Sequence, residues 1–297
     1  MSAVPAQSPD LQARRDARLR GVPAIAAACL AIAGMATLAR AMSGRLPVGQ
    51  LIFLRFFVSL VPVTAAFAVQ RRLPAFRRPR LLALRGLLGG LGVTGYFLSL
   101  EHLPVGPATL LNNTSPAFAT LMAGWFLRER LRARGLWGLA LAMSGAAVVA
   151  WDAAAGRQWG AGIGVAAGLC SAVVAGGALT SMRALRAADT DSLTVLFSFC
   201  VIGVALSAPM AALDWRPLSG PVLWASLGVG LLSAAGQFLL SYGYKFVPVS
   251  VGSTTGLLTT VFSWALGAAL LGEGLTPRAL LGATICAAGV ALTARGA

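Results

Sequence analysis

The sequence predicts an all-α polytopic membrane protein with ten transmembrane helices, arranged as two inverted five-helix repeats with both termini in the cytoplasm. Three observations lead to this fold class. Of the 297 residues, 57% are hydrophobic and only 11% are charged, whereas a soluble domain carries about 25% charged residues. Apolar segments of about 20 residues, the length that crosses a bilayer, follow one another along nearly the whole chain. The second half of the chain also repeats features of the first.

Each predicted element follows from the alternation of apolar and polar segments. Residues 1–21 are polar and rich in Pro, Ala and Arg, which predicts a disordered cytoplasmic tail. We expect a first repeat over residues 22–151 and a second over residues 160–295. The predicted spans are residues 22–41, 48–69, 81–100, 104–127, 135–151, 160–181, 192–213, 220–243, 247–271 and 277–295.

The basic residues orient these spans. The chain has 24 Lys and Arg against 9 Asp and Glu, a formal net charge of +15. Such a balance is typical of nucleic-acid-binding proteins, but here the basic residues lie in short stretches between apolar spans. With a cytoplasmic N-terminus, the cytoplasmic segments hold 17 Lys and Arg and the opposite side holds 5. The positive-inside rule therefore predicts cytoplasmic termini in a bacterial inner membrane and no nucleic-acid partner.

An internal repeat appears when the chain is shifted by 144 residues, which aligns residues 104–150 with 248–294 without a gap. In both copies a Pro-Val pair opens one span, a Glu follows 25 residues later, and glycines recur in the next span. Matching pairs include Pro104 with Pro248, Glu129 with Glu273, and Gly145 with Gly289. Because each copy holds five spans, an odd number, the copies must face opposite ways across the membrane. Inverted repeats are typical of transporters that work by alternating access around a midplane site.

The same residues carry a resemblance to a known family. Residues 95–150, the Leu54-Arg55-Phe56 triplet, the Glu129-Arg130-Leu131 turn and its second copy at Gly272-Glu273-Gly274-Leu275 resemble the repeat unit of the EamA-type drug/metabolite transporters. The resemblance implies ten helices in two inverted repeats, with the first four of each half around a central cavity. It also implies export of amino acids or other small metabolites, as in the aromatic and neutral amino-acid exporter branch. The second copy departs from the first, since Ser198 lies near the place of Arg55.

The fourth span is unusually polar for its expected depth in the membrane. Thr109, Asn112, Asn113 and Pro116 share one helical face, and Ser115 lies beside it. Side chains of this kind either bond neighbouring helices or line a cavity, and two adjacent Asn residues favour the cavity. The repeat-equivalent residues Ser253 and Thr254 are expected to meet this face.

Two arginines lie inside predicted spans. Arg55 is seven residues into the second span, about 10 Å deep at 1.5 Å per residue. It is expected to face the protein interior or water, and either a substrate carboxylate or helix carbonyls are possible partners. Arg85 is nearer a span end and is interpreted as a structural residue that extends to the interface.

Further candidates lie on the third, eighth and ninth spans. The third and eighth spans are repeat equivalents, and their hydroxyl and amide groups suit an amphipathic substrate, although interfacial anchoring explains Tyr242 equally well. The remaining predicted cavity residues are Tyr96, Ser99, Gln237, Ser241, Tyr242 and the mid-span Trp264.

Acidic residues are rare and lie near span ends. Glu129 and Glu273 each precede a span, where a carboxylate caps free N–H groups, so we interpret both as helix caps. Glu101 and His102 remain as a possible proton-coupling pair. Because no Asp or Glu lies well inside a predicted span, the simplest mechanism is uncoupled exchange.

The sequence thus predicts a monomeric secondary transporter in the lipid bilayer that exports small amphipathic metabolites, most of all amino acids, by alternating access. A multidrug or other proton-coupled metabolite exporter is one alternative, and a fixed channel is another. An intramembrane enzyme is a third, but with one His and no intramembrane acid we expect no enzyme, no catalytic residue and no metal. The Gly90–Gly95 stretch matches a dinucleotide fingerprint without a preceding strand, so we expect no cofactor.

Overall fold

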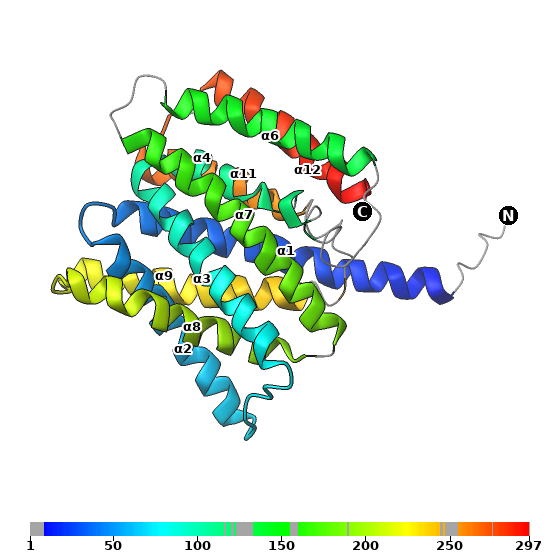
Figure 1. Cartoon of the computed structure of the whole chain (residues 1–297), viewed down its shortest axis with the longest axis vertical. Helices are drawn as coiled ribbons and strands as arrows, with labels where there is room; N and C mark the ends of the chain where they lie inside the picture. Colours follow the sequence, from blue (N-terminus) through cyan, green and yellow to red (C-terminus); the bar gives the residue numbers. More distant parts are fainter. Residues whose placement is uncertain are drawn as a thin grey trace, which may run out of the picture.

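A computed structural model describes residues 9–115, 117–119, 122, 133–154, 160–188, 190–243, 246, 255–274 and 276–296. These residues form helices and connecting turns, and no β-strand occurs among them. The described helices are α1 (Pro9–Ala41), α2 (Val48–Val69), α3 (Pro79–His102), α4 (Val105–Asn112), α6 (Ala133–Ala154), α7 (Gly160–Ala187), α8 (Ser192–Leu213), α9 (Gly220–Gly243), α11 (Leu258–Leu271) and α12 (Pro277–Gly296). Figure 1 shows them packed as a bundle.

Many of these helices have the length and composition of membrane spans. Within the described residues, α2, α3, α7, α8, α9 and the Arg20–Ala41 part of α1 are long and apolar enough to cross a bilayer. The apolar parts of α6 and α11 are shorter. Large apolar side chains such as Trp137, Trp151 and Leu213 are exposed, as expected where the solvent is hydrocarbon. The protein is therefore a multi-pass membrane protein.

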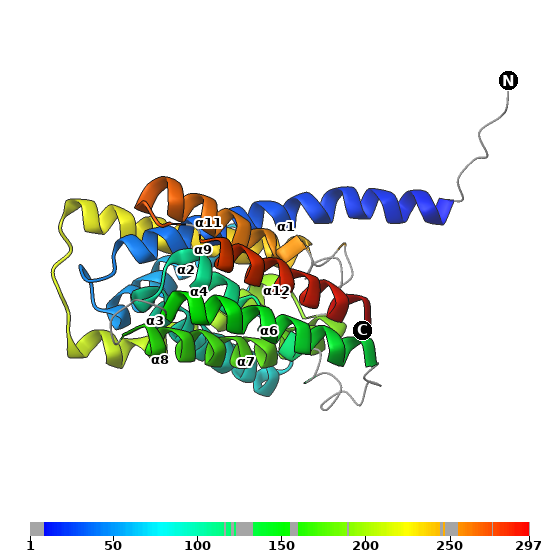
Figure 2. The same ribbon diagram turned by 90° about the horizontal axis from the view of Figure 1, so that it is seen from above.

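The first helix is longer than the predicted first span. α1 begins at Pro9, so residues 9–21, where we expected a disordered tail, are helical. In Figure 2 this end of α1 projects beyond the other helices. Leu, Gln, Ala and Arg dominate this segment, and all have high helix propensity, while Pro suits a first helical position.

The predicted fourth span is interrupted. α4 ends at Asn112, the chain turns at Asn113 and Thr114, and Ser115 is helical again. Pro116 follows in the sequence, and a proline has no N–H to bond the carbonyl four residues earlier, that of Asn112. The ninth predicted span is also interrupted, by a turn at Leu257. Leu257 lies 144 residues after Asn113, so the two breaks are repeat equivalents.

Helix contacts follow a two-fold pattern between α1–α6 and α7–α12. α3 packs on α7 as α9 packs on α1, and α3 packs on α8 as α9 packs on α2. Two further pairs join equivalent helices, α2 with α8 and α6 with α12, and α4 packs on α11, which follows the equivalent break in the second half. The pair α6 and α12 lies at one edge of the bundle (Figure 1). The other helices are thus left to enclose the centre.

Candidate functional site

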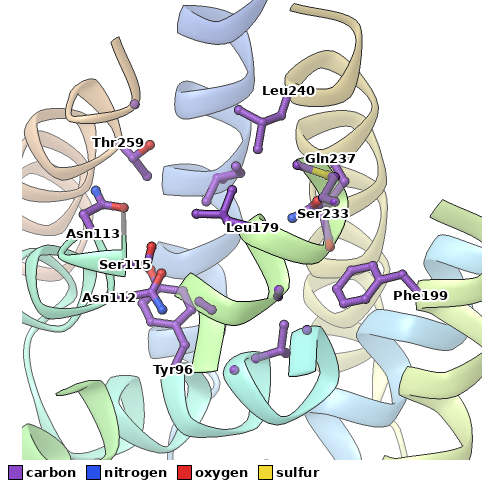
Figure 3. A pocket seen from close by; sticks show the side chains of 18 of the residues that line it. Tyr96, Asn112, Asn113, Ser115, Leu179, Phe199, Ser233, Gln237, Leu240 and Thr259 are labelled. Atoms are coloured by element: carbon purple, nitrogen blue, oxygen red, sulfur yellow. The ribbon is translucent and has the colours of Figure 1, made fainter. Parts of the chain in front are cut away.

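A cavity of about 210 Å³ lies at the centre of the bundle. It is lined by residues of α1, α2, α3, α7, α8, α9 and α11 and by the break that follows α4. Figure 3 shows Asn112, Asn113, Ser115 and Thr259 on one side of it and Phe199 on the other, with Gln237 and Ser233 between. An apolar cavity of about 150 Å³ holds benzene, so this cavity has room for a small metabolite.

The α4 break supplies the amide and hydroxyl side of the cavity. Asn112 Nδ2 donates to Ser171 Oγ on α7 at 2.5 Å, and Ser171 Oγ donates to the Gly92 carbonyl at 2.8 Å. Asn113 Nδ2 donates to Thr260 Oγ1 on α11 at 2.8 Å. Each bond uses one of the two amide N–H groups, so each Asn, both of which line the cavity, keeps a second N–H donor and its oxygen acceptor. A break in a helix at membrane depth is tolerated where it lines such a cavity.

Tyr96 joins the aromatic and polar parts of the wall. Its ring lines the cavity, and its hydroxyl lies 2.7 Å from Thr109 Oγ1 on α4. Both side chains are buried, so each satisfies a polar group of the other that water cannot reach. Thr109 therefore positions Tyr96 and does not line the cavity itself.

Arg55 and Arg85 supply the opposite, cationic side. Both line the cavity and both are buried, with 3% and 8% of their surface exposed. The Arg55 guanidinium carbon lies 4.7 Å from the Phe56 ring centroid and 5.9 Å from that of Phe199, and the Arg85 carbon lies 4.6 Å from Phe199. The two guanidinium groups therefore flank one phenyl ring.

Neither arginine is fully satisfied by the described part of the chain. Arg55 Nε and Nη1 and Arg85 Nε are buried without a hydrogen-bond partner there, and neither arginine forms an ion pair among those residues. A desolvated cation–π contact is worth about 2 kcal/mol or more, but the effective penalty for burying an ion is several kcal/mol and the rings leave the buried N–H groups without a hydrogen-bond acceptor. The rings alone therefore do not compensate for the burial of two positive charges.

The structure brings together only part of the predicted site. Arg55, Tyr96, Asn112, Asn113, Ser115 and Gln237 line the central cavity, and Ser241 lines a smaller pocket that shares Arg85, Phe199 and Gln237 with it. The predicted residues Pro116, Ser253, Thr254 and Glu129 lie outside the described residues.

Besides Thr109, three predicted cavity residues lie elsewhere. Trp264 packs at the α4–α11 contact, where a Cβ on Gly106 would overlap its indole ring. Tyr242 is 43% exposed and stacks on Phe246 with 5.0 Å between ring centroids. Ser99 is fully buried, and its hydroxyl lies against Gly168 of α7. Hydropathy places all three in spans, but which face of a helix meets the centre depends on its packing.

Glu101 and His102 lie at the end of α3 and do not line the central cavity. The Glu101 carbonyl accepts bonds from Arg40 Nη1 at 2.7 Å and Ser43 Oγ at 3.2 Å. His102 Nδ1 donates to the Leu98 carbonyl at 3.0 Å. Neither side chain therefore meets a substrate held in the cavity.

Glu273 caps a helix of the opposite half. Its Oε2 accepts the backbone N–H of Val105, the first residue of α4, at 2.8 Å. Its Oε1 lies 3.6 Å from Arg40 Nε on α1. The first N–H groups of a helix have no partner within it, so this carboxylate satisfies one of them and ties α1, α4 and the end of α11 together.

We expect Glu273→Ala to lower the free energy of unfolding by about 2 kcal/mol, the value of a hydrogen bond to a charged group. Glu273→Gln keeps an oxygen acceptor for Val105 and loses only the ion pair with Arg40, so its effect is expected to be smaller. Thermal unfolding of the detergent-solubilised variants measures the difference. Asp214→Asn is the control, because Asp214 forms a surface pair with Arg216 in which both side chains are at least half exposed. Equal shifts of the unfolding temperature in Glu273→Ala, Glu273→Gln and Asp214→Asn contradict the capping role of Glu273.

Sequence reasoning missed many of the cavity residues, among them Arg85, Phe199, Ser233 and Thr259. The interpretation of Arg85 as an interface-reaching residue is wrong, since it is buried against Phe199. A Cβ at Gly89, one turn later on α3, would overlap Arg85 Nη1, so this glycine leaves the room that the guanidinium occupies. The sequence signal for a buried Arg85 was the glycine four residues later, on the same helix face, which leaves room for the arginine side chain.

No metal or cofactor site emerges from the same region. Among the residues that the structure describes, no group of three or more His, Cys, Asp or Glu side chains could hold a metal ion. The cavity is lined instead by amide, hydroxyl, guanidinium and apolar groups. Such groups bind and orient a ligand, and they do not form a nucleophile–base pair.

Comparison with protein families identifies the family of this chain. The model of the EamA-like transporter family matches residues 19–151 and again residues 162–295. The chain belongs to the EamA-like transporter family. It is therefore a transporter and not an enzyme.

Two relatives and one solved structure extend this family assignment. A "Probable terminal-alkyne amino-acid exporter" of Streptantibioticus cattleyicolor is 33% identical over 80% of this chain and 82% of its own length. The "Pseudopaline exporter CntI" of Pseudomonas aeruginosa is 26% identical over 78% of this chain and 81% of its own. A crystal structure with 22% sequence identity aligns with a TM-score of 0.65 over 94% of this chain and 96% of its own. That likeness concerns the fold alone.

Proposed function

We propose that this EamA-like protein is a secondary transporter that exports small amphipathic metabolites, most of all amino acids, through the central cavity. The observation that carries the proposal is the cavity at the α4 break, which presents a few polar groups on a mainly apolar wall and is enclosed by helices from both halves of the chain. Discontinuous helices at the junction of two repeats are where transporters bind substrate. The names of two relatives, an amino-acid exporter and a pseudopaline exporter, support the same substrate range and direction.

The topology proposed for this function has ten transmembrane helices in two inverted repeats, residues 22–151 and 160–295. The two-fold pattern of helix contacts supports a pseudo-two-fold axis between the halves. The distribution of Lys and Arg among the loops supports cytoplasmic termini in a bacterial inner membrane. Since the cavity is enclosed by helices of a single chain, a monomer suffices for transport.

Alternating access is supported by contacts that close the outer end of the bundle. In this orientation α1 ends on the outer side, where Arg40 bonds the carbonyls of Leu100 and Glu101 and pairs with Glu273. On the same side Gln50 exchanges two hydrogen bonds with the backbone of Arg216, at 2.8 and 3.0 Å. Of the cavity residues, Arg85 of α3 and Leu240 of α9 lie in the cytoplasmic halves of their helices, and Tyr96 lies in the outer half of α3. These outer contacts and the Arg72–Asp191 ion pair at the cytoplasmic end are the contacts proposed to open in turn as substrate passes.

The carrier is proposed to be uncoupled. No Asp or Glu is among the described residues that line the central cavity, and Glu101 and His102 lie away from it. A proton relay through the site would need a titratable group there.

The test is efflux of preloaded radiolabelled amino acids from proteoliposomes that contain only this protein and no ion gradient. Saturable efflux, accelerated at least about threefold by unlabelled amino acid outside, is the expected result, since exchange on a carrier is faster than return of the empty site. Protein-free liposomes are the control. Efflux that rises linearly with concentration indicates a channel, and efflux only under a proton gradient indicates coupling. Absence of flux for acidic, neutral and basic amino acids contradicts the amino-acid proposal.

A further inference from the structure

The central cavity holds two positive charges and, among its described lining residues, no negative one. Arg55 and Arg85 both face Phe199, and the other lining residues are neutral amides, hydroxyls, thiols, thioethers and apolar groups. Two like charges so placed repel each other, and burial weakens the screening that water would provide. An unliganded site of this kind is unfavourable, and a buried charge is stabilised when an opposite charge pairs with it.

Three features indicate that the missing charge belongs to a ligand. Buried guanidinium nitrogens of both arginines lack hydrogen-bond partners within the described residues. Gly89 on α3 leaves the space into which the Arg85 guanidinium folds. Apolar rings, those of Phe56, Phe97 and Phe199, surround the guanidinium of Arg55 and fix its position without neutralising its charge.

We propose that Arg55 and Arg85 form an anion site, and that the transported metabolite is a small carboxylate with net negative charge. This inference rests on the proposed function and names its substrate class. Guanidinium groups bind carboxylates with paired, charge-assisted hydrogen bonds. The amide oxygens of Asn112 and Asn113 on the opposite wall accept hydrogen bonds from an ammonium group of the same molecule. An acidic amino acid satisfies both walls and a plain dicarboxylate satisfies the arginine wall, whereas a basic amino acid brings a second positive charge to two arginines.

The discriminating probe pair is L-glutamate and L-glutamine, which have nearly the same shape and differ by one negative charge. In counterflow assays with proteoliposomes, we expect uptake of glutamate to exceed that of glutamine at least about tenfold in kcat/KM. Arg55→Gln and Arg85→Gln are each expected to remove this preference, and the corresponding Lys variants to keep part of it. Arg80→Gln is the matched control, because Arg80 is an exposed arginine on the same helix as Arg85.

Thermal unfolding in detergent provides a readout independent of flux. Glutamate and succinate are expected to raise the unfolding temperature of the wild type and of Arg80→Gln, whereas glutamine is not. The Arg55→Gln and Arg85→Gln variants are expected to be at least as stable as the wild type without ligand, because each loses an unpaired buried charge. Ligand-induced stabilisation should disappear in both, so misfolding would not explain the loss.

The outcomes separate this inference from the proposed function. Equal counterflow of glutamate and glutamine, unaffected by the arginine variants, overturns the anion site and leaves the exporter standing. Stabilisation by glutamate that needs both arginines, without counterflow of any amino acid, supports the anion site and contradicts amino-acid export. Equal thermal shifts with the acid and the amide, or no shift with either carboxylate, overturn the anion site.

Discussion

Gly289→Ala is expected to lower the stability of the protein more than any other alanine substitution at a helical glycine of α12. A Cβ at Gly289 would overlap the backbone nitrogen of Ala142 on α6 and lie 2.7 Å from the Ala142 Cα. Its repeat mate Gly145 meets the α12 backbone in the same way, 2.8 Å from the Cys286 Cα. Backbone atoms cannot move aside as a flexible side chain does, so α6 and α12 must separate. Overpacking of this kind costs about 1–3 kcal/mol.

The measurement is the unfolding temperature and the fraction of monodisperse protein after size-exclusion chromatography. Gly162→Ala on α7 is the matched control, because nothing lies within 4 Å of a Cβ added there. That substitution is expected to be neutral or to stabilise the helix by up to about 1 kcal/mol, the difference in helix propensity. Equal stability of the two alanine variants contradicts a backbone-to-backbone contact between α6 and α12.

Asn112→Leu is expected to reduce saturable transport strongly while the protein still folds. Leucine has the same number of side-chain heavy atoms and the same branching as asparagine, but it removes the amide that bonds Ser171 and presents an acceptor to the cavity. Ser171 keeps its own bond to the Gly92 carbonyl, so the contact between α3 and α7 persists. Loss of one hydrogen bond to a charged ligand group, about 1.5–3 kcal/mol, corresponds to a reduction of kcat/KM by about 10- to 150-fold.

Counterflow into proteoliposomes at a fixed protein content measures this effect. Ser144→Leu is the control, since Ser144 is exposed on α6 and bonds only the Leu141 carbonyl of its own helix. It makes the same change from polar to apolar outside the cavity and is expected to leave transport unchanged. If Asn112→Leu transports as well as Ser144→Leu, the Asn112 side chain does not contact substrate.

The class of protein was predictable because it depends on local properties of the chain. Hydropathy over about 20 residues identifies a membrane span wherever that span packs, and the structure shows apolar helices over these segments. The family assignment likewise follows from local motifs, such as the Glu273 turn and the polar fourth span, which the family model also matches. Even the α4 break has a local cause, because Pro116 has no N–H for Asn112.

The partners of each side chain were not predictable, because they come from the other half of the chain. Glu273 caps α4, which begins 168 residues earlier, and Trp264 packs against Gly106 instead of facing the cavity. Arg85 is close enough to its helix end to reach the interface, yet packing against Phe199 of α8 buries it beside Arg55. By itself the sequence determined that the chain spans a membrane, since the transfer of an apolar segment into lipid depends on that segment alone. Its local motifs determined that it is a transporter. Only the tertiary structure decided which charges meet at the centre, since that depends on contacts between helices far apart in the chain.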